Sequence, residues 1–87
     1  MKREKITFEF DENYSFDDQI PEGFKCIDEE ITYFDSGKGF CNYDVIIQRK
    51  SDGKFFKGGI WEGQGRTEIE NEWEEVFQQI VTKEIYV

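Results

Sequence analysis

Two runs of alternating apolar and polar residues, CNYDVIIQRK and KFFKGGIW, flank the segment Ser51-Asp52-Gly53 and constrain this chain more than any other feature. Asp-Gly favours a two-residue type I′ turn, whose twist matches that of the strands that it joins. This turn places Val45 opposite Ile60 and Ile47 opposite Gly58. The pattern therefore predicts a central β-hairpin over residues 43–61.

The two faces of this hairpin differ in polarity. One face is predicted to form the core, because its side chains are nearly all apolar: Tyr43, Val45, Ile47, Phe56 and Ile60. The other face mixes Ile46, Phe55 and Trp61 with Asp44, Gln48, Lys50 and Lys57. Such a face is either partly covered by another element or a binding surface, for which Phe55, Lys57 and Trp61 are the candidate residues. The pair Gly58-Gly59 indicates a β-bulge or a close approach of another part of the chain.

The residues before the hairpin predict a first strand and a short helix. Over residues 5–11, Ile6, Phe8 and Phe10 alternate with polar residues, which is typical of a half-buried strand. We expect Phe8 and Phe10 to pack on the apolar face of the hairpin. Ser15 is a weak N-cap for a helical turn over residues 15–20, which Pro21-Glu22-Gly23 ends. Extended structure is predicted to follow from Phe24 to Phe34.

The last third of the chain has two interpretations. As a helix, residues 68–79 place Ile69, Trp73, Val76 and Phe77 on one stripe. As strands, the same residues alternate glutamates with Ile69, Asn71 and Trp73, and the residues alone do not decide between the two. Residues 80–87, IVTKEIYV, are rich in β-branched and aromatic side chains and predict a closing strand. An exposed edge there would offer a route to a homodimer.

These elements predict one domain over residues 1–87 that is mainly β: a small twisted antiparallel sheet around the central hairpin, with one short helix on a face. An α+β domain is the alternative if 68–79 is helical. A chain of 87 residues buries one modest core. Its nine Phe, four Tyr and two Trp are suited to fill that core.

The charge of the chain restricts its function. Twenty acidic residues against eleven basic ones give a net charge of −9, which argues against binding to nucleic acid or to an anionic membrane by bulk charge. The chain has no histidine, so it lacks the usual general base and the commonest metal ligand. We expect no enzymatic activity, no cofactor and no metal site.

The start of the chain and its cysteines point to one compartment. MKREKITFEF lacks the apolar run of a signal peptide, and no stretch reaches the length of a membrane span, so we expect a cytoplasmic protein. Cys26 and Cys41 are then expected to be free thiols.

Three segments carry a resemblance to a known group: FEFDENYSFDDQIPEGFKCI, then YDVIIQRKSDGKFF, then an acidic stretch with EVF and VTKEIYV. From Lys5 onward the chain resembles short acidic proteins encoded by bacteriophages and prophages of Gram-positive bacteria. The resemblance implies an early phage product in the cytoplasm of a bacterial host, within a class that includes inhibitors of host or defence enzymes such as anti-CRISPR proteins. It also favours extended structure over 68–79, and it implies no site residue.

The acidic residues suggest where a partner would bind. Residues 62–75 hold six carboxylates and one base, Arg66. On a strand, Glu68, Glu70, Glu72 and Glu74 would lie roughly 6.6 Å apart on one face, a spacing comparable to that of nucleic-acid phosphates. With Glu75 they are the candidate residues for mimicking DNA and binding a basic site on a host or defence protein.

Two other interpretations of the charge remain open at this point. The acidic residues are also what a merely well-solvated surface would carry. The alternative function is an oligomeric nucleotide or small-ligand binding module that sequesters a signal molecule.

Overall fold

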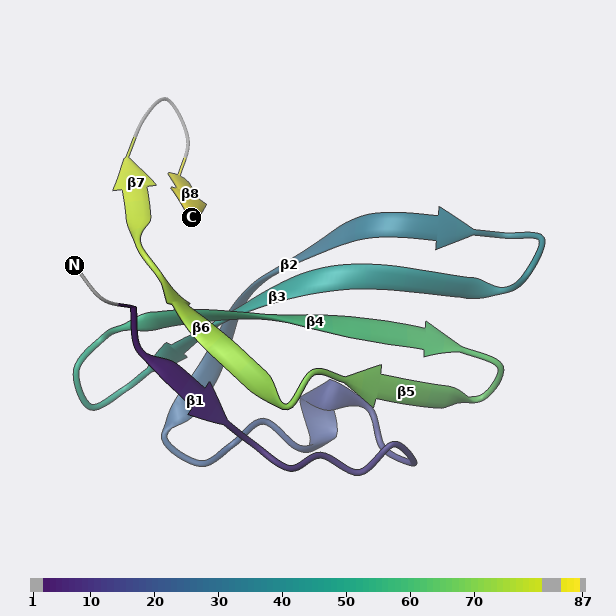
Figure 1. The fold of residues 1–87 in the computed structure, drawn as a ribbon, viewed down its shortest axis with the longest axis horizontal. Helices are drawn as coiled ribbons and strands as arrows, with labels where there is room; N and C mark the ends of the chain where they lie inside the picture. The colour runs from purple at the N-terminus through teal and green to yellow at the C-terminus, as the bar shows by residue number, and fades with distance from the viewer. Residues whose placement is uncertain (1–2, 81–83, 87) are drawn as a thin grey trace.

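The computed structural model describes residues 3–80 and 84–86, which form a six-stranded antiparallel sheet and a separate two-stranded one (Figure 1). Six strands make up the large sheet: β1 (Lys5–Thr7), β2 (Phe24–Asp35), β3 (Phe40–Arg49), β4 (Phe55–Gly63), β5 (Arg66–Ile69) and β6 (Glu72–Val76). The prediction of a mainly β fold is confirmed. The predicted short helix is a single 3-10 turn, η1 (Phe16–Asp18), and the described residues contain no α-helix. Its Ser15 does not cap a backbone N–H but donates a hydrogen bond to Asp18 Oδ2.

The strands of the large sheet follow the order β1-β6-β4-β3-β2, and β5 pairs with β4 beyond β6. Glu74 is five positions after Ile69, whereas their partners on β4, Lys57 and Ile60, are only three positions apart. Because Glu70 still bonds to Gly59, the two extra residues are Asn71 and Glu72, which form a bulge relative to β4. The open question about residues 68–79 is thereby answered, because this segment is extended from β5 through β7 (Gln78–Ile80).

The first strand continues beyond β1 as a looser ladder. Ile6 lies opposite Trp73, and two further backbone bonds keep the same register, from Phe8 N to Asn71 O at 2.8 Å and from Thr67 N to Glu12 O at 3.2 Å. Residues 5–12 therefore run beside residues 67–74. Of the strand predicted over residues 5–11, Lys5–Thr7 form β1 and the remainder continues as this looser ladder.

The central hairpin forms, but its turn is longer than predicted. Val45 lies opposite Gly58 and Ile47 opposite Phe56, so the predicted register was wrong by two residues. Four residues, Lys50–Gly53, make the loop, which a bond from Gly53 N to Arg49 O at 2.8 Å closes. A shift of two residues leaves each side chain on its own face. The predicted assignment of the two faces is therefore confirmed.

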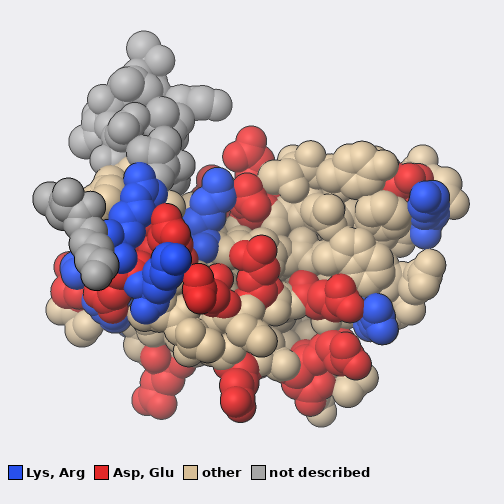
Figure 2. Space-filling model, in the orientation of Figure 1, with Lys and Arg blue, Asp and Glu red and all other residues tan. Residues whose placement is uncertain are grey.

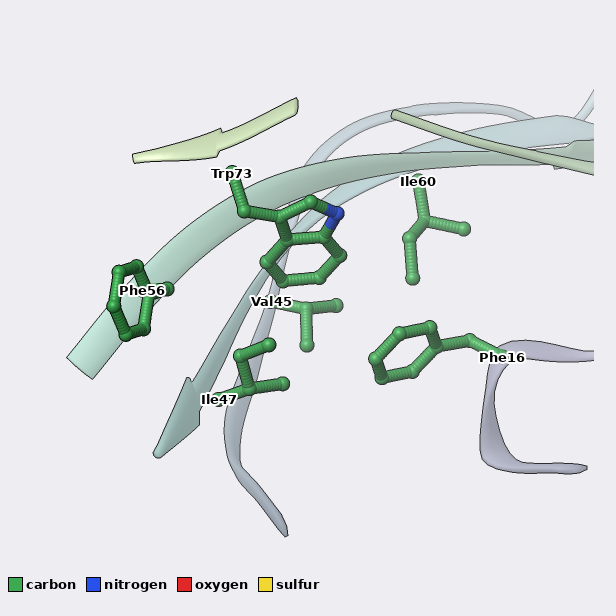
Figure 3. Close-up of a cluster of buried hydrophobic side chains, with 6 residues drawn as sticks. All are labelled: Phe16, Val45, Ile47, Phe56, Ile60 and Trp73. Atoms are coloured by element: carbon green, nitrogen blue, oxygen red, sulfur yellow. The ribbon is translucent and has the colours of Figure 1, made fainter. Parts of the chain in front are cut away.

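The core lies on the apolar face of the hairpin (Figure 3). Trp73 from β6 and Phe16 from η1 complete the fully buried cluster, whose members are Phe16, Val45, Ile47, Phe56, Ile60 and Trp73. The covering segment, residues 8–24, passes over this face and packs four further apolar side chains around the cluster: Phe8, Phe10, Ile20 and Phe24. The expected packing of Phe8 and Phe10 on the hairpin is confirmed.

The two adjacent glycines of β4 serve opposite sides of the sheet. Gly58 lies under the indole of Trp73 on the core side, so the predicted close approach is confirmed there. Gly59 faces away from the core and lies beside the carboxylate of Glu70. The bulge is on the neighbouring segment, at Asn71 and Glu72.

The end of the chain differs from the prediction. The predicted closing strand over 80–87 appears as β8 (Glu84–Tyr86), which pairs with β7 and not with the large sheet. Residues 81–83 and 87 of that prediction lie outside the described residues. In the large sheet, β6 takes the position beside β1.

The two cysteines lie at opposite ends of the β2–β3 pair. Cys26 is opposite Ile47, whereas Cys41 is opposite Phe34. Six residues of β3 separate Ile47 from Cys41, or roughly 20 Å at a rise of about 3.3 Å per residue. A disulfide needs its two Cα atoms within about 7 Å. Both thiols are free, as predicted. In the described part of the chain, no helix combines the length and the apolar character that crossing a membrane requires.

Candidate binding surface on the outer face of the sheet

The four alternating glutamates share one face of the sheet. Trp73 and Ile69 point into the core, so their neighbours Glu68, Glu70, Glu72 and Glu74 point the other way. We call this side, opposite the core, the outer face. Relative to β4, Glu68 and Glu70 keep the register of β5, whereas Glu74 keeps the register of β6, which is shifted by two residues.

Glu75 does not belong to this surface, and its assignment as a partner-binding residue was wrong. It follows the alternation of Trp73, lies on the core side and is only 7% exposed. Its Oε1 accepts a hydrogen bond from the backbone N of Glu4 at 3.1 Å, while its own N donates to Glu4 O at 2.8 Å. Glu75 therefore fixes the start of the chain to β6.

Each carboxylate of the row already has a partner within the chain. Arg66 lies 2.9 Å from Glu68, and Lys5 lies 3.7 Å from Glu72 and 4.0 Å from Glu74. Glu70 Oε2 accepts a hydrogen bond from the backbone N of Gly59. Exposed ion pairs of this kind contribute at most about 1 kcal/mol. Basic side chains of a partner can therefore replace these internal ion pairs at little cost in free energy.

Three aromatic side chains, which we call the aromatic band, cross the outer face: Tyr33 of β2, Phe40 of β3 and Trp61 of β4. They lie at the ends of these strands that are distant from the hairpin loop Lys50–Gly53. The ring centroids of Tyr33 and Phe40 are 5.6 Å apart, and those of Phe40 and Trp61 are 5.8 Å apart. Trp61 lies directly opposite Glu68, and the guanidinium of Arg66 lies 5.9 Å from its ring. Figure 2 shows a broad uncharged surface over this part of the sheet, with carboxylates along one side. The band thus adjoins the acidic row.

Of the three residues proposed as a secondary surface, two lie on the part of the outer face that the acidic row and the aromatic band share. Trp61 is part of the aromatic band, and Lys57 reaches Asp44 Oδ2 at 3.3 Å on the outer face. Phe55 shares the face but lies opposite the buried Val76. Its ring therefore belongs to an apolar corner of the sheet.

The sequence pointed to neither Tyr33 nor Phe40 as site residues. They join Trp61 only through the register of β2 on β3, which two bulges shift. The one signal that could have identified Tyr33 and Phe40 is that they are aromatic residues without a place in the predicted core. Tyr33 is 51% exposed, and its neighbours Ile31 and Phe34 are each 65% exposed.

A hollow opens on the outer face above Gly59, beside the aromatic band. It has a volume of about 450 Å³ and is lined by Asn42, Asp44, Gly59, Trp61, Glu68 and Glu70, among others. Asp44 lies directly opposite Gly59 on β3, and Glu70 lies beside Gly59 on the other strand. The hollow exists because a glycine occupies a position where a side chain would otherwise stand.

The two groups whose pKa values are raised mainly by burial are poorly suited to catalysis. Burial, reinforced by the carboxylate of Glu29, raises the pKa of Cys26 to about 11, so its thiol stays protonated and is a weak nucleophile near neutral pH. Burial and a hydrogen bond to Glu62 raise the pKa of Tyr43 well above its usual value. Within residues 3–80 and 84–86, no group of three carboxylates or thiols is arranged to hold a metal ion.

Comparisons with protein-family models, with curated proteins and with solved structures find no match to this chain.

Proposed function

We propose that this chain is a non-catalytic binding protein whose outer face occupies a basic site on another protein. In the bacterial setting that the phage resemblance implies, that partner is a host or defence protein, and the blocked site is one that binds nucleic acid. The observation that carries the proposal is the placement of Trp61 directly opposite Glu68, which joins the aromatic band to the acidic row on one face.

This combination suits a protein partner. Aromatic residues are enriched where proteins meet, and exposed apolar patches bordered by polar residues mark such surfaces. The carboxylates supply long-range attraction and speed the encounter, while the rings supply the buried area. The same carboxylates line the hollow above Gly59 and would repel a phosphate, so the outer face supports the nucleotide-binding alternative less well.

The experiment compares two variants of equal net charge. The first changes Glu68, Glu70, Glu72 and Glu74 to Gln on the outer face. The control changes four exposed carboxylates of the covering segment and of the core side of β2 in the same way: Glu12, Asp17, Glu22 and Glu29. Each immobilised protein is used to capture partners from a bacterial lysate, and the captured proteins are identified by mass spectrometry.

We expect the unchanged chain and the control to capture the same basic protein and the outer-face variant to lose it. Association with that protein should slow by one to three orders of magnitude, the range that electrostatic steering covers. If both variants lose the partner equally, only net charge matters. If neither does, the acidic residues serve solubility, and the proposal fails.

A further inference from the structure

We infer that the hollow above Gly59 accepts an arginine side chain, whose guanidinium lies between the carboxylates of Asp44 and Glu70. This inference rests on the proposed function and names the group on the partner that the outer face recognises.

The backbone sets two carboxylates on either side of an empty position. Asp44 is the cross-strand partner of Gly59 on one side. On the other side, Glu70 N donates to Gly59 O at 3.0 Å, and Glu70 Oε2 accepts from Gly59 N at 3.1 Å. Two strand spacings of about 4.8 Å each separate the backbones of Asp44 and Glu70 by about 10 Å. The Glu70 carboxylate lies at the edge of this space, 3.4 Å from where a Cβ of Gly59 would stand. The hollow of about 450 Å³ leaves room for a planar group between Glu70 and Asp44.

The polar side-chain groups that line this space are mainly hydrogen-bond acceptors. They include the carboxylates of Asp44, Glu68 and Glu70. Asn42 also lines the hollow, but its side-chain oxygen is closed off from the surface and receives no hydrogen bond from the described residues. A guanidinium carries five donors and no acceptor. It therefore matches the lining, whereas a phosphate or a carboxylate does not.

The aromatic wall favours arginine over lysine. Trp61 borders the hollow, and guanidinium groups stack on indole faces while also forming forked bonds to carboxylates. Arg66, from this same chain, already lies over the Trp61 ring while it pairs with Glu68. The Trp61 ring therefore packs against a guanidinium that is paired with a carboxylate of the acidic row.

Lys57 competes with the arginine for Asp44. Its Nζ lies 3.3 Å from Asp44 Oδ2 at the rim of the hollow, and both side chains are more than one-third exposed. Removing Lys57 should therefore leave Asp44 Oδ2 free to accept a hydrogen bond from the arginine. The affinity for arginine should rise by more than the loss of one positive charge alone would cause.

The test uses fluorescently labelled oligo-arginine and oligo-lysine peptides of equal length, with affinities measured by anisotropy. Gly59→Val fills the hollow without changing any charge. The backbone accepts a side chain there, because a Cβ at Gly59 would approach no atom closer than 3.4 Å and the residue does not have the positive φ that disfavours side chains. Asp44→Asn with Glu70→Gln is the companion variant, should the valine disturb the sheet. Lys57→Met is compared with Lys50→Met, which removes the same charge from the hairpin loop.

We expect the unchanged chain to prefer oligo-arginine over oligo-lysine. Gly59→Val and the double variant should each weaken oligo-arginine binding roughly tenfold, about the effect of one charge-assisted contact. Lys57→Met should strengthen it about two- to fivefold, and Lys50→Met should strengthen it less, because its gain is only that of net charge.

The outcomes separate the inference from the proposed function. Equal binding of the two peptides, or unchanged oligo-arginine binding by both Gly59→Val and the double variant, overturns the arginine site. The proposed function survives that result if the outer-face variant at Glu68, Glu70, Glu72 and Glu74 still loses its protein partner. If that variant keeps its partner, the proposed function fails as well.

Discussion

The indole of Trp73 lies so close to Gly58 that a Cβ at position 58 would be 2.3 Å from its Cδ2 and Cε2 atoms. No real Cβ contact is that short, so this tryptophan requires a glycine beneath it. Gly59, the next residue, carries no such requirement, since its added Cβ would meet the Glu70 carboxyl carbon at 3.4 Å, an ordinary contact. One glycine is needed for the core, and its neighbour creates the hollow.

The two glycines should therefore respond differently to the same change. Gly58→Ala forces the Trp73 ring out of its position and should cost about 1–3 kcal/mol or more, as overpacking does. In a domain of this size, each kcal/mol lowers Tm by about 4–8 °C. Gly59→Ala should melt within a few degrees of the unchanged chain. Differential scanning calorimetry distinguishes the two, and equal melting temperatures would contradict the placement of Trp73.

The hairpin core gives a second prediction. Ile47 is fully buried, so Ile47→Ala should lower the free energy of unfolding by about 2–5 kcal/mol. Ile31→Ala is the matched control, because Ile31 is 65% exposed and should change stability by less than about 0.5 kcal/mol. Urea unfolding measures both changes. Ile31 lies on the same side of the sheet as Ile47, opposite Tyr43, so the comparison isolates burial from the choice of face. If the control were the more damaging variant, the core would not be centred on Ile47.

Arg49 should make stability depend on acid pH. Its guanidinium bonds to Glu4 at 2.8 Å and to Asp52 at 2.7 Å, and it holds the pKa of each carboxyl down at about 2. In the unfolded chain these groups titrate near their usual values of about 4. Their stabilisation is thus complete above about pH 5 and is lost as the pH falls towards 2.

The variant Arg49→Met tests this linkage. Its Tm should lie below that of the unchanged chain near neutral pH, and the gap should narrow as the pH falls from about 5 to 2. Arg66→Met removes the same charge from an exposed pair with Glu68 and is the control. A gap that stays constant across this range would show that Arg49 acts by packing on Phe56, whose ring lies 5.1 Å from its guanidinium, and not by charge.

The Cys26 thiol should react slowly in the folded protein. Since its pKa is raised to about 11, the thiolate fraction near neutral pH should be roughly a hundredfold below that of an ordinary cysteine. In a Cys41→Ser background, alkylation by iodoacetamide should be slow near pH 7 and should accelerate as the pH rises towards 11. Glu29→Gln should speed the reaction, because the Glu29 carboxylate contributes to the shift. Rapid alkylation of the native state at pH 7 would exclude the buried environment.

Alternation along the chain was enough to predict which way most side chains point. It placed Val45, Ile47 and Ile60 in the core and Trp61 outside it, because strand periodicity does not depend on the pairing partner. The cross-strand register of the central hairpin could not be predicted from alternation alone. The Asp52 side chain accepts bonds from Arg49 and from the backbone N of Lys54, and Lys50 N donates to Gly23 O. These contacts stabilise a four-residue loop, and the last of them comes from a distant segment that no local pattern reveals.

The candidate site was predictable to a similar extent. The glutamates of the row share a face, as alternation requires, but Glu75 follows Glu74 and must point to the opposite side. The aromatic band depends on which strands are neighbours, and the bulges of β2 decide whether Tyr33 reaches Phe40. A bulge adds a residue without leaving a clear sequence signature. Cross-strand neighbours of this kind therefore appear only in the folded chain.

The edge strand β2 has a consequence for self-assembly. Asp28, Glu29 and Glu30 stand at its middle, and pairing shifts flank them between Cys26 and Asp28 and between Ile31 and Tyr33. A second copy that tried to extend the sheet there would meet an irregular backbone and a block of like charge, both of which oppose edge-to-edge polymerisation. The side chains of Ile31 and Phe34, each 65% exposed, lie on the same strand. The charges and the irregular backbone of β2 therefore stand beside the apolar groups that would otherwise favour pairing with a second copy.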